Sequence, residues 1–231
     1  MSLPILVAGD SYSVEWPTQF ATLVPNQITN ISSKGRSNTF IWTSVVNYLT
    51  QQKTKHLVVV GNSFITRMDT WQGKSLIQEQ SESNGFWEKH GHPERQRGNM
   101  SVPLQIFDDQ YKKWFKTSDI CGLWIEYYFQ LFCFAHTLKS LGHDFFLFNA
   151  AVNVMGDDEL DEDFRGYLIN TPFYNYCRNH PNILPGDQFS IPSWCKENNV
   201  NTTDTGHIAD SEGCLMFGKW VHGQLLRGKL I

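Results

Sequence analysis

The sequence lacks the features that mark several large classes of protein. Its five cysteines are an odd number and include no Cys-x-x-Cys pair, so we expect neither a disulfide framework nor a zinc knuckle. Basic residues are not in excess, because 19 Lys and Arg stand against 23 Asp and Glu for a formal charge of -4. Binding through phosphates requires concentrated Lys and Arg, so nucleic acid is not an expected partner.

Long apolar runs are absent as well. The longest apolar stretch, 120–138, is interrupted by Glu126, Gln130 and His136, which suits a buried or amphipathic helix better than a membrane span. The first four residues carry no basic region of the kind that opens a secretory signal. These observations predict a cytoplasmic protein without a membrane partner.

Short apolar runs alternate in the sequence with segments of helical period. The runs at 3–8, 27–32, 56–60 and 143–148 predict buried strands, and the main helical segments are 16–24, 37–50, 107–141 and 210–226. Strands that alternate with helices indicate parallel crossovers and a sheet covered on both faces. We therefore expect one α/β domain over residues 1–231, a three-layer α/β/α sandwich with a central parallel sheet and flavodoxin-like winding.

The stretch from about 62 to 105 is polar and has no sustained period, which predicts an insertion or long loop over one end of the sheet. Such loops often form the rims of active sites. Its His90, His92 and Glu94 are residue types that bind zinc when they converge, but in a loop with Pro and Gly we favour solvated side chains. The insertion is therefore expected to border a site without holding a metal.

Gly9-Asp10-Ser11 follows the first predicted strand directly. Ser11 is therefore expected on a sharp turn at the carboxyl edge of the sheet, where ligands of such folds bind. Taken alone, the tripeptide is more typical of a simple turn, because Asp and Ser bond their own backbone there. A serine becomes a nucleophile only when an imidazole takes its proton and a third group fixes that imidazole.

A candidate imidazole stands before the last predicted helix, in the segment Asp204-Thr205-Gly206-His207. Gly206 lets the chain turn, and the spacing lets the carboxylate of Asp204 reach the ring of His207. The alternative is structural, with Asp204 or Asp210 capping the final helix. This segment alone leaves both interpretations open.

Together the two segments resemble the SGNH or GDSL hydrolase family. That family carries a Gly-Asp-Ser block after the first strand, a Gly in a second block, an Asn in a third and Asp-x-x-His before the last helix, and this chain has all four in that order. The resemblance implies that Ser11 is the nucleophile, that His207 is the general base and then acid, and that Asp204 orients His207. The block at 35–38 is also similar to SGNH-like proteins encoded in bacteriophage genomes, whose products would act in the host cytoplasm.

The same resemblance implies an oxyanion hole formed by the backbone N–H groups of Ser11 and Gly35 and by the side chain of Asn62. The third block departs from the usual Gly-x-Asn-Asp, because it reads Gly-Asn-Ser-Phe and brings the Asn one position early. Asn38 or the Ser63 hydroxyl is therefore an alternative donor. A purely structural interpretation, in which Asn62 closes a turn at the strand end, also stays open.

The function that the resemblance implies is ester cleavage through an acyl-enzyme, with no metal or organic cofactor. Trp71 and Trp87 in the polar insertion favour a sugar, because aromatic rings stack on sugar faces. An acetyl ester of a carbohydrate is thus the expected substrate, and a small-molecule ester is the other partner class. A different class of function stays open, namely a catalytically inactive protein of this fold that binds a glycan or has a structural role.

Overall fold

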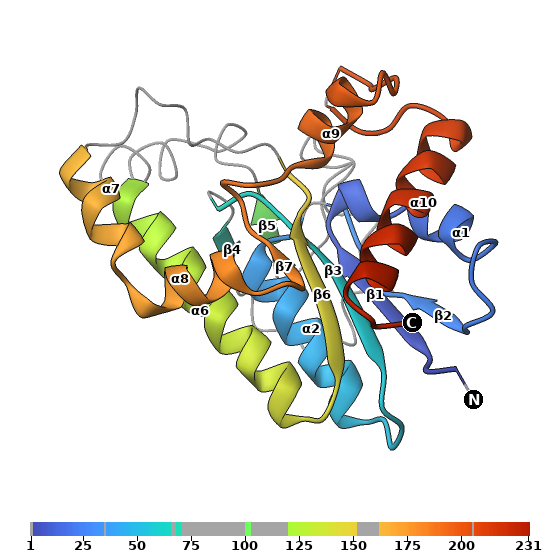
Figure 1. Ribbon diagram of the computed structural model, residues 1–231, viewed down its shortest axis with the longest axis horizontal. Helices are drawn as coiled ribbons and strands as arrows, with labels where there is room; N and C mark the ends of the chain where they lie inside the picture. Colours follow the sequence, from blue (N-terminus) through green and yellow to red (C-terminus); the bar gives the residue numbers. More distant parts are fainter. Residues whose placement is uncertain are drawn as a thin grey trace.

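The computed structural model describes residues 2–34, 36–65, 68–70, 100–102, 120–151, 162–204 and 206–231. Five strands form a central sheet in which every neighbouring pair is parallel. Across the sheet they are β2 Ile28–Asn30, β1 Ile5–Gly9, β3 Leu57–Asn62, β6 Asp144–Asn149 and β7 Ile183–Leu184 (Figure 1). Counted along the chain, this order is 2-1-3-4-5, which is the flavodoxin-like order. The predicted winding is confirmed.

Helices cover both faces of this sheet (Figure 1). They are η1 Ser11–Ser13, α1 Trp16–Phe20, α2 Asn38–Thr50, α6 Ile120–Ser140, α7 Glu162–Ile169, α8 Pro172–Asn179, α9 Ile191–Glu197 and α10 Ser211–Arg227. Side chains alternate along β1, so that Leu6 and Ala8 join the core under α2, α6 and α8. Ile5 and Val7 join the second core, under α1, α9 and α10. The predicted three-layer α/β/α sandwich is therefore confirmed.

Aromatic side chains fill both cores. Trp124 and Tyr128 of α6 are stacked on one face of the sheet, with ring centroids 5.9 Å apart. On the other face Trp16 meets Phe217 edge to face, with centroids 5.4 Å apart. All four side chains are almost completely buried, and burial of such large rings is a major source of stability.

The region from 167 to 192 is more regular than the sequence predicts. We expect one short helix there, whereas the structure has the end of α7, all of α8 and the edge strand β7. β7 contributes only Ile183 and Leu184, which pair with Leu147 and Phe148 of β6. Two residues are too few to produce a recognisable strand pattern.

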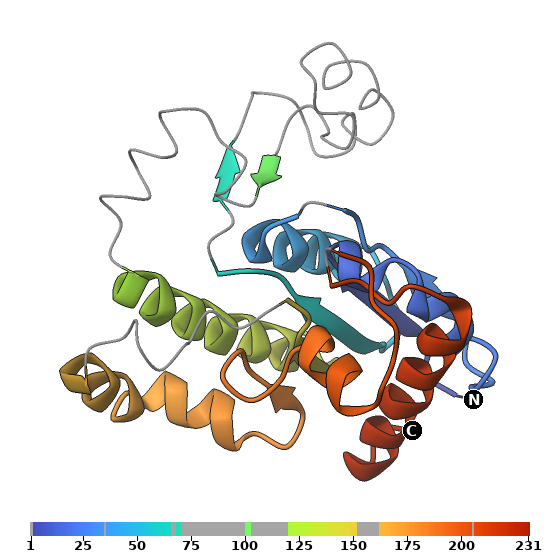
Figure 2. The same cartoon turned by 90° about the horizontal axis from the view of Figure 1, so that it is seen from above.

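Only part of the predicted insertion at about 62–105 belongs to the described residues. Within it, β4 Met68–Thr70 and β5 Met100–Val102 pair in antiparallel fashion and form a two-stranded sheet apart from the central one (Figure 2). Trp71, Trp87, His90, His92 and Glu94 lie outside the described residues.

The described ranges contain neither a metal-ligand cluster nor a helix suited to cross a membrane. In that part of the chain, no cluster of three or more His, Cys, Asp or Glu side chains could hold a metal ion. None of the helices described there combines the length and apolar character that a bilayer crossing needs.

Candidate active site

Asp10 and Ser11 carry the chain from the carboxyl end of β1 into η1. Asp10 is fully buried, and its Oδ1 accepts a hydrogen bond from the backbone N–H of Tyr12 at 3.0 Å. Its other oxygen, Oδ2, accepts a hydrogen bond from the Ser63 hydroxyl at 2.7 Å. Ser11 therefore begins a closely held turn, at a first helical position whose N–H has no partner within the helix.

Two adjacent glycines let this turn lie directly on the sheet. Gly9 of β1 pairs with Gly61 of β3, and the fully buried Ser13 of η1 packs against both. A Cβ added to Gly9 would lie 2.4 Å from Ser13 Oγ, and one added to Gly61 would lie 2.3 Å from it. The glycine of the Gly-Asp-Ser segment is thus required by this close approach.

His207 comes from a tight turn near the other end of the chain. The Thr203 N–H donates to the carbonyl oxygen of His207 at 2.8 Å, and the His207 N–H donates to Thr203 Oγ1 at 3.2 Å. Gly206 closes this turn with a φ of +80°, which few residues other than glycine adopt. Of the two predicted caps of the final helix, Asp210 is the one that the structure uses, since its Oδ1 accepts from the Gly213 N–H at 2.7 Å.

Ser11 and His207 meet at the carboxyl edge of the sheet. The distance between Ser11 Oγ and His207 Nε2 is 2.7 Å, and both residues are half-buried. The imidazole is stacked on the ring of Tyr12, with centroids 4.2 Å apart and an interplanar angle of 12°. An imidazole nitrogen at this distance from a hydroxyl can take its proton as a general base.

Asp204 does not join this pair. Its side chain is exposed, and among the described residues no hydrogen bond or ion pair connects it to His207. The turn is closed by the backbone and hydroxyl of Thr203, which leaves the neighbouring carboxylate on the solvent side. Within the described part of the chain, no hydrogen bond or ion pair supports the orienting role that the family resemblance implies for Asp204.

The side chains considered for the oxyanion hole bind neighbouring groups, although the Nδ2 of Asn62 is buried and has no hydrogen-bond partner among the described residues. Asn62, at the end of β3, is fully buried, and its Oδ1 accepts from Trp42 Nε1 of α2 at 2.9 Å. Asn38 binds the backbone of Ser63 twice, since its Oδ1 accepts from the Ser63 N–H at 2.6 Å and its Nδ2 donates to the Ser63 carbonyl at 3.1 Å. The Ser63 hydroxyl donates to Asp10. The three side chains therefore tie α2 and the β1 turn to the end of β3.

The predicted backbone donors of the oxyanion hole are the N–H groups of Ser11 and Gly35. Ser11 stands at the first position of η1, where a backbone N–H has no partner within the helix. Gly35 lies outside the described residues.

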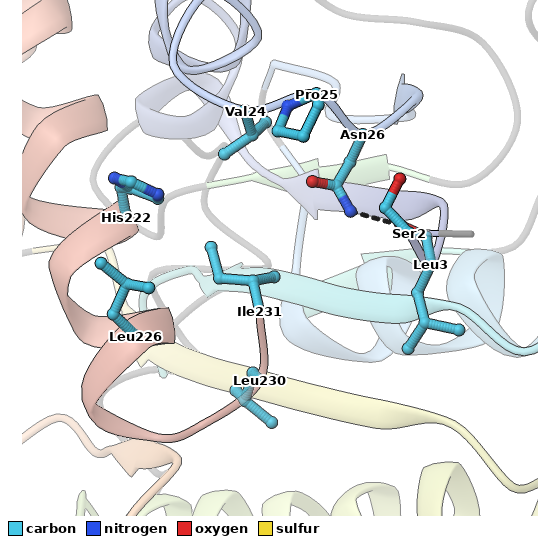
Figure 3. A pocket seen from close by; sticks show the side chains of 9 residues that line it. All are labelled: Ser2, Leu3, Val24, Pro25, Asn26, His222, Leu226, Leu230 and Ile231. Carbon is cyan, nitrogen blue, oxygen red and sulfur yellow. Dashed lines mark hydrogen bonds between the residues drawn. The ribbon is translucent and has the colours of Figure 1, made fainter.

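A pocket with a volume of about 320 Å³ lies at the other end of β1 (Figure 3). It is bordered by Leu3 before β1, by Asn26 before β2, and by His222 and Leu226 of α10. The Asn26 Nδ2 donates to the Leu3 carbonyl at 2.7 Å. Because Leu3 precedes β1 and Ser11 follows it, this pocket is separate from the Ser11–His207 pair.

Neither a family model nor a curated protein matches the sequence. Among solved structures, the chain is similar to a protein assigned to the G-D-S-L family of lipolytic proteins from Desulfitobacterium hafniense DCB-2, with 13% identity and a TM-score of 0.46 over 97% of this chain and 100% of that one. It is also similar to the C-terminal catalytic domain of peptidoglycan O-acetyltransferase A from Streptococcus pneumoniae, with 10% identity and a TM-score of 0.44 over 99% of this chain and 96% of that one. Neither source is a bacteriophage, and likenesses at this level assign neither a family nor an activity to the chain.

Proposed function

We propose that this chain is a serine-dependent ester hydrolase in which Ser11 is the nucleophile and His207 is the base. The observation that carries the proposal is the 2.7 Å contact between Ser11 Oγ and His207 Nε2. The two residues come from opposite ends of the chain and meet where ligands bind in folds of this winding. A half-buried hydroxyl held against an imidazole is the arrangement that nucleophilic catalysis by serine requires.

In the first step, Ser11 Oγ bonds to the ester carbonyl carbon while its proton passes to His207 Nε2. Negative charge develops on the carbonyl oxygen, which the backbone N–H groups of Ser11 and Gly35 are proposed to bind. The tetrahedral intermediate then collapses, the bond to the alcohol oxygen breaks, and the alcohol takes the proton from the imidazolium. The acyl group remains on Ser11.

In the second step, water attacks the acyl-enzyme. His207 removes a proton from the water as it bonds to the acyl carbon, and returns that proton to Ser11 Oγ when the acid leaves. These two steps require no metal or organic cofactor.

The proposed substrate is an acetyl ester of a carbohydrate. This choice depends on Trp71 and Trp87 of the polar insertion, because aromatic rings can stack on sugar faces.

A fluorophosphonate probe tests the nucleophile, because it bonds to serines that an imidazole activates. We expect the wild-type protein to be labelled on Ser11, Ser11→Ala to be unlabelled, and His207→Ala to be labelled far more slowly. Ser13→Ala is the matched control, since Ser13 lies two residues away, is fully buried, and has a hydroxyl without a hydrogen-bond partner among the described residues. Labelling of this control should match the wild type.

Turnover of p-nitrophenyl acetate and acetate release from an acetylated glycan measure the reaction itself. We expect Ser11→Ala to lower kcat/KM by roughly 10³-fold or more. A folded wild-type protein that is neither labelled nor active would overturn the proposal and favour the inactive glycan-binding alternative. Cleavage of long acyl esters with no release of acetate from glycans would support the proposed hydrolase activity and contradict the proposed carbohydrate substrate.

A further inference from the structure

Tyr12 directly follows the proposed nucleophile and covers one face of the proposed base. The rings of Tyr12 and His207 are nearly parallel, at 12°, with centroids 4.2 Å apart. Tyr12 is only 7% exposed, and Phe64 meets it edge to face at 6.1 Å. A Cβ added to Gly206 would lie 3.4 Å from the Tyr12 hydroxyl oxygen, so the phenol extends along the turn that carries His207.

Ser11 and Tyr12 contact the imidazole of His207 from two directions. The hydrogen bond with Ser11 involves the edge of the ring, at Nε2, whereas Tyr12 covers its face. The stack with Tyr12 fixes the plane of the ring. Tyr12 is itself held at its backbone, because its N–H donates to the buried Asp10 carboxylate.

We infer that Tyr12 is a positioning residue of the proposed hydrolase, which holds the imidazole of His207 in the plane that directs Nε2 at Ser11 and stabilises the imidazolium formed on proton transfer. The face of an aromatic ring carries negative charge and attracts a cation placed over it. In a Ser-His-Asp triad a carboxylate performs both tasks. The catalytic consequence rests on the proposed function, whereas the effect on the imidazole does not.

Charged residues also lie on the segments near His207 in the chain and on the elements of the same core. They are Asp10, Glu15, Lys196, Asp204, Asp210 and Glu212. Asp10 and Asp210 cap η1 and α10, and the other four are exposed. All six stay in place when only Tyr12 is replaced, so a change in the titration of His207 reports the loss of the ring.

The test follows the titration of the His207 imidazole by NMR in the wild type, Tyr12→Phe and Tyr12→Leu. The chain has eight histidines, and His207→Gln identifies the signal. Phenylalanine keeps the ring face, so its titration midpoint should match the wild type. Leucine removes the ring, and we expect the midpoint to move to lower pH by about 0.5 unit. With an ester substrate, Tyr12→Leu should lower kcat by about tenfold and change KM less, and Tyr12→Phe should restore kcat.

Phe20→Leu controls for general loosening of the core. Phe20 is a fully buried aromatic residue of the same core, and its ring packs on Trp16. Its replacement should lower stability without moving the midpoint of His207. Asp204→Asn compares the carboxylate with the ring, and we expect it to change kcat by less than about threefold, because no hydrogen bond or ion pair joins Asp204 to His207 among the described residues.

An unchanged midpoint in folded Tyr12→Leu, or an equal shift in Phe20→Leu, would overturn the inference. A larger loss of kcat in Asp204→Asn than in Tyr12→Leu would do the same. Tyr12→Met is a second variant without a ring, for use if the leucine variant does not fold. The NMR titration needs no substrate, so a wild-type protein that cleaves no ester counts against the proposed function while the midpoint shift still decides the inference.

Discussion

Asp10 and Ser63 join the two loops that follow the adjacent strands β1 and β3, because the Ser63 hydroxyl donates to Asp10 Oδ2 at 2.7 Å. The other carboxylate oxygen of Asp10 accepts the N–H of Tyr12. One fully buried carboxylate therefore stabilises the turn that carries Ser11 and also connects this turn to the loop after β3. The Asp of the Gly-Asp-Ser segment supports the site and does not take part in the proposed reaction.

Replacing this carboxylate by an amide should destabilise the protein. In Asp10→Asn one oxygen becomes an NH2 group that faces a donor, so we expect the free energy of unfolding to fall by about 1–3 kcal/mol. Asp210→Asn is the matched control. Asp210 is an exposed N-cap residue in which one carboxylate oxygen accepts a hydrogen bond, and Asn caps helices as well as Asp does. Urea unfolding measures both variants. A loss in Asp10→Asn no greater than in Asp210→Asn would contradict the role of Asp10.

The layers and the winding of the fold can be predicted from the sequence because burial of the central strands is encoded locally. β1 is a continuous apolar run that ends in Gly9, and β3 is an apolar run that closes with Gly61 and Asn62. Such runs are typical of strands covered on both faces. β7 has no such signature, since it is a two-residue edge strand that depends on its pairing with β6.

The residues of the site can be predicted only in part. Ser11 and His207 stand in recognisable blocks, whereas the direction of the Asn62 side chain depends on Trp42, which comes from another element. The stack of Tyr12 on His207 depends on a turn almost two hundred positions away. Contacts between distant segments leave no periodic signal along the chain.

Gly61 should tolerate a methyl group only when Ser13 loses its hydroxyl. In Gly61→Ala the new Cβ would lie 2.3 Å from Ser13 Oγ, and we expect a loss of about 1–3 kcal/mol from overpacking. Ser13→Ala alone should be nearly neutral, because that hydroxyl has no hydrogen-bond partner among the described residues. The double variant should recover most of the loss, although Ala150 and Phe148 are also close to the new methyl group.

Gly9→Ala is the contrasting variant in the same double-mutant cycle. A Cβ at Gly9 would lie 2.4 Å from Ser13 Oγ and also 2.5 Å from Ser13 Cβ. Removing the hydroxyl therefore leaves a clash, and Ser13→Ala should not rescue this variant. Equal rescue of both glycine variants, measured by urea unfolding, would show that η1 shifts and does not press on the sheet as observed.

Asn62→Ala should lower stability and leave the chemistry of the folded protein nearly unchanged. Trp42 would lose the acceptor of its buried indole N–H, which costs about 1–3 kcal/mol. Loss of an oxyanion donor would instead lower kcat by roughly 10²- to 10³-fold. We expect kcat to change by less than about threefold at a temperature where the variant is folded.

Asn149→Ala is the matched comparison for Asn62→Ala. Asn149 pairs with Asn62 in register at the end of β6, is buried, and donates to the Ala151 carbonyl at 2.6 Å. Both alanine variants should therefore be less stable and similarly active. A hundredfold fall in kcat confined to Asn62→Ala would contradict this prediction and would indicate that Asn62 is a donor of the oxyanion hole.

We expect His143 to make the stability of the fold depend on pH. It lies immediately before β6 and is buried, and its Nδ1 accepts a hydrogen bond from the His56 N–H at 3.0 Å. Burial, together with the nearby His56 and Lys55, lowers the pKa of His143 below its ordinary value of 6.5. The neutral ring is thus the form that the folded state favours.

The sign of the pH effect follows from proton binding. As the pH falls through 6.5, the unfolded chain binds a proton at His143 before the folded chain does, so stability that is complete above this pH is lost below it. His143→Asn keeps an acceptor near the position of Nδ1 and cannot titrate. We expect its free energy of unfolding, measured in urea at a series of pH values, to decline less steeply than that of the wild type between about pH 7 and 5. His180, whose pKa burial also lowers, is retained in both proteins, so a slope should remain, and identical slopes would show that His143 does not contribute.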